Sequence, residues 1–489
     1  MTELRVKRMA LVLALQGCFA AAQAQVTEEP VDIGSRLELM VDRHLIRNME
    51  GVRLKLHAPQ KMPLSANPLP SSAYTTVIKD GATYRAYYRA VIPGYKGPMH
   101  DGHPGEISCY AESADGIEWR KPNLGLFEMN GSFSNNVILY TVPFCHNFSP
   151  FLDRRPENAR GKRFKALAGV QPSKHFTAEG LHAFESEDGI RWSRMQDGPV
   201  ITATDAAAFD SQNVAFWSEA EACYVCYFRT WTPPPGRLRS ISRATSRDFL
   251  NWSAPVAADP NLPGEHLYTS QSHPYFRAPH IYVALPTRYT AGRVAGQKTH
   301  AMLGSTDILF MTSRAGTTVF DRLFPEAFIR PGLDPARWSN RSNYAALNVV
   351  PTGPAEMSIY HAVSGHRYVL RTDGFVSVHA DSSCGSFTTR ALVFSGSGKE
   401  SPVYLLLNAS TSAAGHIRCE LRTADGKAVP GFSLNECVTL YGDGLELPVA
   451  WKGGSDVNRL AGQPVTLHVE LAEADVFAFR FGQPERQVR

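Results

Sequence analysis

A turn motif that recurs along this 489-residue chain constrains its fold more than any other sequence feature. Three clear copies begin at Ser113, Ser186 and Ser246. Each has an aspartate two residues after the serine and a tryptophan six residues after it. A degenerate fourth copy runs from Ser313 to Phe320. The serines are 73, 60 and 67 residues apart, which suits propeller blades with variable loops better than a helical solenoid.

A second repeat lies between these turns and consists of pairs of short apolar strands. Five alternating strands can be read at residues 84–88, 164–168, 224–228, 281–285 and 357–360. A shorter apolar strand precedes each of them, at residues 74–78, 148–152, 213–217, 274–276 and 344–350. Since no convincing amphipathic helix interrupts this order, the sequence predicts a five-bladed β-propeller. We expect residues 37–57 to supply a strand that closes the ring against the last blade.

The aspartates of the turn motif have a structural explanation. Asp and Ser side chains hydrogen-bond the backbone of tight turns, and a tryptophan caps the core of the blade. We therefore predict that Asp115, Asp188 and Asp248 hold turns and are not catalytic.

The repeat stops near residue 366, where a new pattern begins. Alternating apolar runs at residues 403–407, 417–421 and 465–471 are punctuated by Gly and Pro, as in an antiparallel β-sandwich of roughly seven or eight strands. The predicted fold class is therefore all-β. The predicted divisions are a signal peptide over residues 1–24, a propeller with its closing strand over 25–365, and a β-sandwich over 366–489.

The N-terminus predicts export. Basic residues at positions 5, 7 and 8 precede an apolar run at 9–15, and small residues lead to a cleavage site after Ala24. Residues 15–18 faintly resemble a lipobox that would anchor the protein at Cys18, but the glutamine at position 16 is unusual there. We expect a periplasmic or secreted protein. No later segment is apolar enough to span a membrane.

Charge and cysteine content exclude other classes of protein. Removing residues 1–24 lowers the formal net charge from +4 to +2, and this balance argues against a nucleic-acid partner. Seven of the eight cysteines remain, an odd number that rules out a fully paired disulfide framework. Cys223 and Cys226 lie three apart in a predicted strand, where their side chains point to opposite faces, so a redox motif is not expected.

Carboxylates at one face of the propeller are the candidates for catalysis. The start of each inner strand and the loop after each second strand open on the same face. Asp210 and Glu265 stand at equivalent places in adjacent blades, and two carboxylates facing one cavity are what glycoside hydrolysis needs. Their alternative role is hydrogen bonding to a neighbouring blade. Asp153 is a third candidate, although it follows its inner strand and so fits the opposite rim as well.

Arginines predict the charge of the substrate. Arg89, Arg229 and Arg288 occupy corresponding places at the ends of second strands, and Arg341 lies in the loop before the fifth inner strand. Guanidinium groups there would suit a uronate or a sulfate ester, because they pair bidentately with such anions. Surface ion pairs between blades are an equally good explanation.

Other polar residues at the same face are candidate substrate ligands. These are Asp101, His146, Gln212, His273 and Asn343. A metal site built on His100, Asp101 and His103 lacks nameable further ligands, so neither a metal nor another cofactor is predicted.

Several segments resemble secreted bacterial propeller proteins related to glycoside hydrolase families 32 and 43. They are residues 37–46, 109–113, 147–153, 209–213, 275–280 and 373–377, and the resemblance spans nearly the whole mature chain. It implies a five-bladed propeller that acts on carbohydrate. Better-studied relatives place an acidic residue at the first inner strand, but residues 66–74 contain none. Their catalytic trio therefore does not carry over to this chain.

We expect a hydrolase that cleaves a glycosidic bond in an oligosaccharide or polysaccharide with Asp210 and Glu265 as its carboxylate pair. A non-catalytic glycan-binding propeller is the first alternative. A sialidase-like hydrolase is the second, prompted by the Ser-x-Asp turns and the arginines, although the Asp-to-Gly spacing is one residue shorter than in the sialidase box. The sugar, the linkage, the stereochemical outcome and the oligomeric state stay open.

Overall fold

The computed structural model describes residues 29–158, 161–170, 180–202, 208–233, 235–293, 303–398 and 401–484. The predicted signal peptide and Cys18 lie outside these ranges. The described residues form β-strands and four 3-10 helices, η1 (Phe144–His146), η2 (Pro156–Asn158), η3 (Pro335–Arg337) and η4 (Asn458–Leu460). No helix within these ranges is long and apolar enough to cross a membrane. The predicted fold class, an all-β propeller followed by a β-sandwich, is confirmed.

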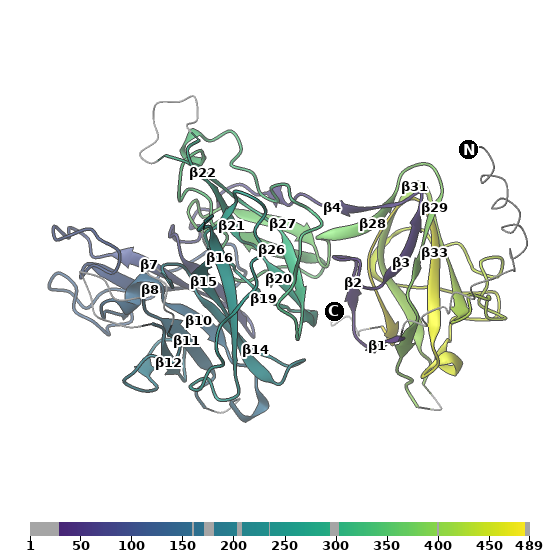
Figure 1. Ribbon diagram of the computed structural model, residues 1–489, viewed down its shortest axis with the longest axis horizontal. Helices are drawn as coiled ribbons and strands as arrows, with labels where there is room; N and C mark the ends of the chain where they lie inside the picture. Colours follow the sequence, from purple (N-terminus) through teal and green to yellow (C-terminus); the bar gives the residue numbers. More distant parts are fainter. Residues whose placement is uncertain are drawn as a thin grey trace, which may run out of the picture.

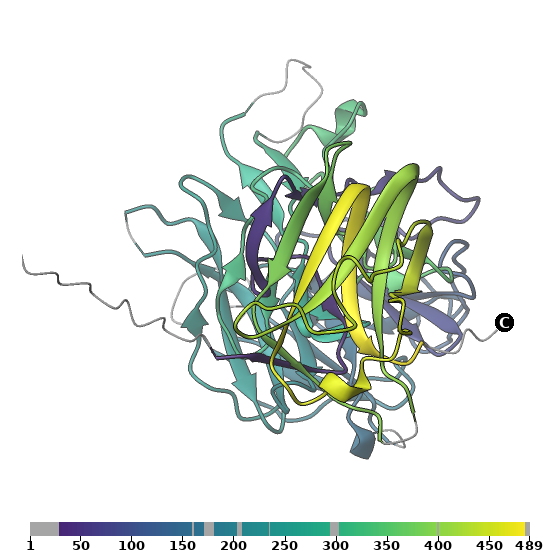
Figure 2. The same cartoon turned by 90° about the vertical axis from the view of Figure 1, so that its right-hand side faces the viewer.

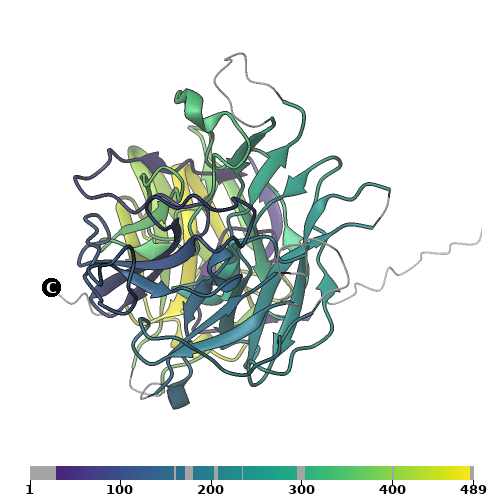
Figure 3. The same ribbon diagram turned by 90° about the vertical axis from the view of Figure 1, so that its left-hand side faces the viewer.

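Five antiparallel sheets of four strands each form the propeller, seen on the left of Figure 1 and facing the viewer in Figure 3. Their first strands contact one another in a ring: β6 touches β10 and β25, and β14 touches β10 and β19. Blade one consists of β6 (Thr75–Asp80), β7 (Thr83–Val91), β8 (Glu106–Ser113) and β9 (Val137–Leu139). Blade two consists of β10 (Ser149–Leu152), β11 (Phe164–Ala168), β12 (His182–Ser186) and β13 (Ser193–Arg194). Blade three consists of β14 (Val214–Ser218), β15 (Cys223–Trp231), β16 (Arg239–Ser246) and β17 (Val256–Ala257). Blade four consists of β19 (His273–Tyr275), β20 (Ala278–Ala284), β23 (Met311–Arg314) and β24 (Phe320–Asp321). Blade five consists of β25 (Val350–Pro351), β26 (Glu356–Tyr360), β27 (Arg367–Arg371) and β5 (Gln60–Lys61).

Blade four carries an additional sheet, whose first strand precedes β19 and whose other two strands lie between β20 and β23. β18 (His266–Leu267), β21 (Thr287–Thr290) and β22 (Ser305–Ile308) form a separate three-stranded sheet. This excursion lengthens the chain before β19 and shifts residue positions relative to the other blades.

The strand that closes the propeller is β5, in which Lys61 pairs with Tyr368 and Gln60 pairs with Val369. The prediction that residues 37–57 close the ring is wrong. Those residues form β2 (Glu38–Leu39), β3 (Ile46–Glu50) and β4 (Arg53–Leu56), which pair with strands of the C-terminal sheet. Their apolar side chains fill the second domain and the interface between the domains, so they are unavailable to the last blade.

The second domain is one ten-stranded sheet curved around a single apolar core. Figure 2 shows it facing the viewer, with purple N-terminal strands beside green and yellow C-terminal ones. It combines β2, β3, β4 and β1 (Val31–Gly34) with β28 (Val376–Ala380), β29 (Gly385–Thr389), β30 (Leu392–Phe394), β31 (Tyr404–Thr423), β32 (Asp443–Pro448) and β33 (Val465–Gly482).

The predicted divisions of the chain therefore change. The expected seven or eight strands become ten because four come from the N-terminal segment, and the runs at 403–407 and 417–421 belong to one long strand, β31. The propeller extends to the end of β27 and not to residue 365. The sandwich domain is thus made of two separate pieces of the chain.

An interdomain clasp of four side chains fixes the two domains together. Arg314 of β23 donates to Glu38 at 2.7 Å and to both carboxylate oxygens of Asp42 at 2.8 and 3.0 Å. His280 of β20 lies 3.0 Å from the other oxygen of Glu38. Burial would raise the pKa of Glu38, but the hydrogen bond from His280 and the charge of Arg314 outweigh it and lower the pKa to about 2.

The recurring turns are structural, as their chemistry indicates. In the second copy, Ser186 Oγ donates to Asp188 Oδ1 at 3.1 Å and accepts from the Gly189 N–H at 2.9 Å. The same Asp188 oxygen accepts from the N–H groups of Ile190 and Arg191, both at 2.8 Å. The first and third copies repeat these bonds.

Replacing Asp188 by alanine should lower the free energy of unfolding by about 1 kcal/mol, since two backbone N–H groups lose their acceptor. Catalysis should be unchanged. Urea denaturation checks the first expectation, and Glu187→Ala is the control because Glu187 is exposed next to the same turn. Equal stability of the two variants would contradict this role.

Candidate active site

One residue from each blade stands where the chain enters its inner strand, and together they define what we call the Asp210 mouth. They are Tyr74, His146, Asp210, Tyr268 and Tyr344. The Tyr74 ring meets those of His146 and Tyr344 edge-on at centroid distances of 6.0 Å, and Tyr268 meets Tyr344 at 5.7 Å. Asp210 is the only carboxylate of the five.

A tight turn aims Asp210 into this mouth. Phe209 has a φ of +66°, a left-handed conformation that is uncommon for a non-glycine residue. Its carbonyl oxygen accepts hydrogen bonds from the side-chain amides of Asn147 at 2.8 Å and Asn213 at 2.9 Å. These amides explain why residues 147 and 213 are asparagines. The Asp210 side chain is left 27% exposed.

Two cationic neighbours hold Asp210 in its ionised form. Arg229 donates to one carboxylate oxygen at 3.0 Å, and His146 Nε2 lies 3.4 Å from the other. Burial would raise the pKa of Asp210, but the His146 hydrogen bond and the Arg229 charge lower it to about 2. Asp210 is therefore an anion at neutral pH, suited to attack or to accept a proton.

His146 connects Asp210 to a second, buried carboxylate. His146 Nδ1 lies 3.0 and 3.1 Å from the two oxygens of Glu106, the first residue of β8. Burial would lower the pKa of His146, but its hydrogen bonds to Asp210 and Glu106 raise it. Arg89 donates to the His146 carbonyl oxygen at 3.0 Å and lies 3.7 Å from Glu106.

Asp101 brings a further carboxylate to the mouth from an exposed loop of blade one. One oxygen of Asp101, one nitrogen of His146 and one oxygen of Asp210 all lie within 4.8 Å of one another. The backbone nitrogen of Gly102 lies 3.2 Å from His146 Nδ1, which keeps the loop next to this ring. Two carboxylates and an imidazole are also ligand types of divalent metal sites, so Asp101, His146 and Asp210 are possible metal ligands, whereas the sequence predicts no metal.

Arginines and aromatic rings form one wall of the mouth. The guanidinium of Arg239 lies 4.8 Å from the ring centre of Tyr268 and 4.9 Å from that of Trp231. Arg229 also lies over both rings, at 5.9 and 5.6 Å. Arg341 Nε donates to the Tyr268 hydroxyl at 3.2 Å. Trp231 Nε1 is buried and has no hydrogen-bond partner among the described residues.

Six of the sequence-predicted site residues therefore meet at one place: Arg89, Asp101, His146, Asp210, Arg229 and Arg341. The sequence analysis missed the tyrosines of the mouth, together with Glu106, Trp231 and Arg239. Tyr74 and Tyr344 carried a usable signal, because each begins a predicted inner strand, whereas Tyr268 lies six residues before the predicted strand at 274–276.

Glu265 does not join this group. Arg322 donates to its two oxygens at 2.7 and 3.1 Å, and the Leu262 N–H donates at 3.1 Å. Arg288 forms a bidentate pair with Asp307 at 2.9 and 2.6 Å and lies 3.9 Å from Glu265. The predicted pairing of Glu265 with Asp210 is therefore not supported, because the extra sheet of blade four places Tyr268 at the position that matches Asp210.

Asp153 is buried at the other end of its inner strand. Its carboxylate accepts from the Tyr224 hydroxyl, from Asn158 at 2.6 Å and from Arg155 at 3.2 Å, and its side chain is 0% exposed. These partners give it a structural role and leave no access for a substrate.

Two other predicted ligands, Gln212 and His273, hold the propeller together. Gln212 donates to Thr76 Oγ1 at 2.9 Å and accepts from Gln271 at 2.8 Å, and Gln271 also donates to the Ala345 carbonyl at 2.7 Å. This glutamine bridge joins blades one, three, four and five, so it crosses the propeller axis. His273 lies near the Gln271 and Val349 backbone at 2.9 and 3.0 Å.

Asn343 is also structural. Its amide donates to the carbonyl oxygens of Thr306 and Arg337, both at 2.7 Å, and its oxygen lies 3.0 Å from His361 Nε2. It fixes the loop that carries Arg341 rather than facing the mouth.

No family model matches this chain, and no curated protein matches it. Among solved structures, it is similar to a glycoside hydrolase family 43 arabinoxylan arabinofuranohydrolase from Bacillus subtilis, at 14% identity and a TM-score of 0.40, over 86% of this chain and 97% of that one. A thermostable family-43 glycoside hydrolase matches at 11% identity and a TM-score of 0.41, over 65% and 92%. An N-acetylgalactosamine deacetylase from F. plautii matches at 10% identity and a TM-score of 0.41, over 86% and 95%.

Proposed function

We propose that this protein is a glycoside hydrolase that cleaves an anionic carbohydrate at the Asp210 mouth. The observation that carries the proposal is the approach of two carboxylates, Asp101 and Asp210, to within 4.8 Å in a setting of arginines and aromatic rings. Aromatic faces stack on sugar rings, and guanidinium groups pair with carboxylates and sulfates.

The two carboxylates have different roles in this proposal. Asp210 is ionised and fixed by Arg229, so it attacks the anomeric carbon. Asp101 faces Asp210 from its loop and is the second carboxyl group of the pair, in the place of the acid/base. The separation favours retention of configuration, because retaining enzymes keep their carboxyl groups about 5 to 5.5 Å apart and inverting enzymes leave about 6.5 to 9.5 Å.

Release of new reducing ends from uronate-containing or sulfated polysaccharides tests this function. The wild type should cleave at least one anionic polymer and leave neutral polymers intact. Binding of saccharides without any release of reducing ends would instead establish a non-catalytic glycan-binding propeller. Release of sialic acid from sialosides would indicate the sialidase-like alternative.

Replacing Arg341 by glutamine should raise KM for the anionic substrate about tenfold, with little change in kcat. Arg341 is exposed at the mouth and donates to the Tyr268 hydroxyl at 3.2 Å, so its charge contributes to substrate binding and not to bond cleavage. Steady-state kinetics on the polymer and on its carboxyl-reduced form separate the two effects. An equal loss on both polymers would contradict recognition of the negative charge.

A second candidate function, metal-dependent hydrolysis, is favoured by the convergence of Asp101, His146 and Asp210. The buried Glu106 next to His146 Nδ1 matches the carboxylate that commonly orients a metal-binding histidine. Dialysis against a chelator decides between the candidates. A carboxylate mechanism keeps full activity, whereas a metal mechanism loses it at least a hundredfold and recovers it on adding Mn²⁺ or Zn²⁺.

A further inference from the structure

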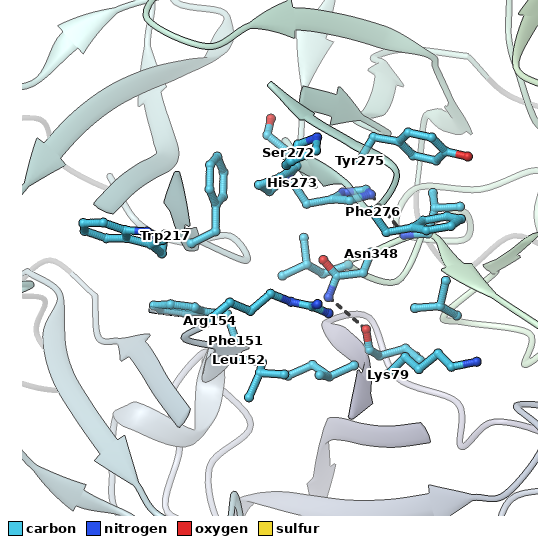
Figure 4. A pocket seen from close by; sticks show the side chains of 18 of the residues that line it. Lys79, Phe151, Leu152, Arg154, Trp217, Ser272, His273, Tyr275, Phe276 and Asn348 are labelled. Carbon is cyan, nitrogen blue, oxygen red and sulfur yellow. Dashed lines mark hydrogen bonds between the residues drawn. The ribbon is translucent and has the colours of Figure 1, made fainter. Parts of the chain in front are cut away.

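A second cavity opens at the end of the propeller opposite the Asp210 mouth. It has a volume of about 250 Å³ and is lined by residues of all five blades, at and beyond the ends of the inner strands. We call it the lower mouth, and Figure 4 shows it from close by. The glutamine bridge lies between the two mouths along the chain. Gln212 follows Asp210 and precedes Ala215, which lines the lower mouth. Gln271 likewise follows Tyr268 and precedes the lining residue Ser272.

Aromatic side chains form the sides of the lower mouth. Trp217 and Phe276 are both partly exposed and lie on opposite sides of the view in Figure 4, with Phe151 buried beside them. Such faces bind the apolar side of a sugar ring. Nothing in the mechanism proposed for Asp210 uses these residues.

One guanidinium reaches into this cavity. Arg154 extends toward Asn348 in Figure 4, and among the described residues it has neither a hydrogen bond nor an ion pair. The neighbouring lysine is occupied, because Lys79 Nζ donates to the Tyr84 hydroxyl at 2.8 Å and to the Pro351 carbonyl at 3.3 Å. Glu219 also lines the cavity but makes no ion pair with Arg154. Arg154 is thus a cation available to a bound anion.

A buried hydroxyl adds a polar requirement. Ser272 is 0% exposed and lines the cavity, and its Oγ has no hydrogen-bond partner within the described ranges. Buried hydroxyl groups in native proteins nearly always have a partner. A ligand hydroxyl or a water carried with the ligand would satisfy it.

We propose that the lower mouth is a second carbohydrate site that binds a single hexuronic acid residue. Its ring packs against the partly exposed Trp217 and its carboxylate pairs with Arg154. The site requires no bond cleavage, so it stands whether or not the Asp210 mouth is a hydrolase.

Calorimetric titration with D-glucuronate, which has no glycosidic bond to cleave, tests this site. The wild type should bind glucuronate with a Kd of about 1 mM, and neutral D-glucose at least tenfold more weakly. Arg154→Gln and Trp217→Ala should each weaken glucuronate binding at least tenfold. Arg154 is exposed, so its variant should keep the wild-type melting temperature.

Arg341→Gln is the matched control, because it removes an exposed arginine from the other mouth. It should weaken only glucuronate binding at the Asp210 mouth, and the binding event that Arg154→Gln removes should remain in this variant. The proposal is overturned if glucuronate fails to bind, if Arg154→Gln binds as the wild type does, or if Arg341→Gln alone abolishes binding. Failure of polysaccharide cleavage with glucuronate binding intact would refute the hydrolase and leave the lower mouth in place.

Discussion

Asp210→Asn is expected to lower kcat by about a thousandfold or more on any polysaccharide that the wild type cleaves. The amide keeps the size of the side chain but removes the negative charge that Arg229 and His146 hold in place. Positioned acid, base and nucleophilic groups contribute about 10² to 10⁴ in rate. Reducing-end assays at saturating substrate measure the loss, and circular dichroism checks that the variant is folded.

Glu265→Gln is the matched control, because it also converts a carboxylate to an amide and lies outside the Asp210 mouth. It should keep kcat within a few-fold of the wild type while lowering stability, since Arg322 loses its partner. Loss of activity in Glu265→Gln with full activity in Asp210→Asn would reverse the assignment. Asp101→Ala should also lose activity on the polysaccharide. On substrates whose leaving group departs without protonation, this variant should regain most of that activity.

Glu38→Gln is expected to cost about 3 to 5 kcal/mol of unfolding free energy, because it leaves Arg314 partly unpaired in the interdomain clasp. The pKa of Glu38 is lowered from 4.5 to about 2 in the folded protein. The stability that this carboxylate contributes is therefore complete above the unfolded pKa and is lost as the pH falls toward 2. The shift corresponds to roughly 3 kcal/mol.

Urea denaturation at pH 7, 4 and 3 measures this effect. The difference between wild type and Glu38→Gln should be largest at pH 7 and shrink at each lower pH. Glu50→Gln serves as the control because Glu50 is exposed on β3 of the same domain, and it should match the wild type at every pH. A difference that grows on acidification would show that the clasp is not stabilised by ionised Glu38.

The parts of the fold that local chemistry encodes could be predicted from the sequence. The turn at Asp188 is recognisable because its serine and aspartate bond to atoms only two or three residues away. The closing strand was misassigned because the partners of residues 37–57 lie more than 300 residues along the chain. Both a blade and a sandwich offer an apolar face to such a segment, and its sequence pattern does not distinguish them.

The candidate site could be predicted in part for a similar reason. Asp210 and His146 enter their inner strands at comparable points, so counting along the blades places both at the mouth. Counting failed at Glu265 because β18 takes up residues just before β19, where the other blades run directly into their inner strands. Tyr268 took the corresponding position, and it stands six residues before the predicted strand at 274–276, so counting along the blade does not assign it to the mouth.

The pairing of β2, β3 and β4 with the C-terminal sheet has a consequence for synthesis. These strands are synthesised before the propeller, yet β33, which pairs with β2 and joins β28, β29 and β31, is made more than 400 residues later. The backbone N–H and C=O groups at the edges of these strands stay unpaired while the propeller is synthesised. Unpaired strand edges can associate with other chains during that time. The sandwich domain is therefore completed only after β33 has been synthesised, although β2, β3 and β4 are made before the propeller.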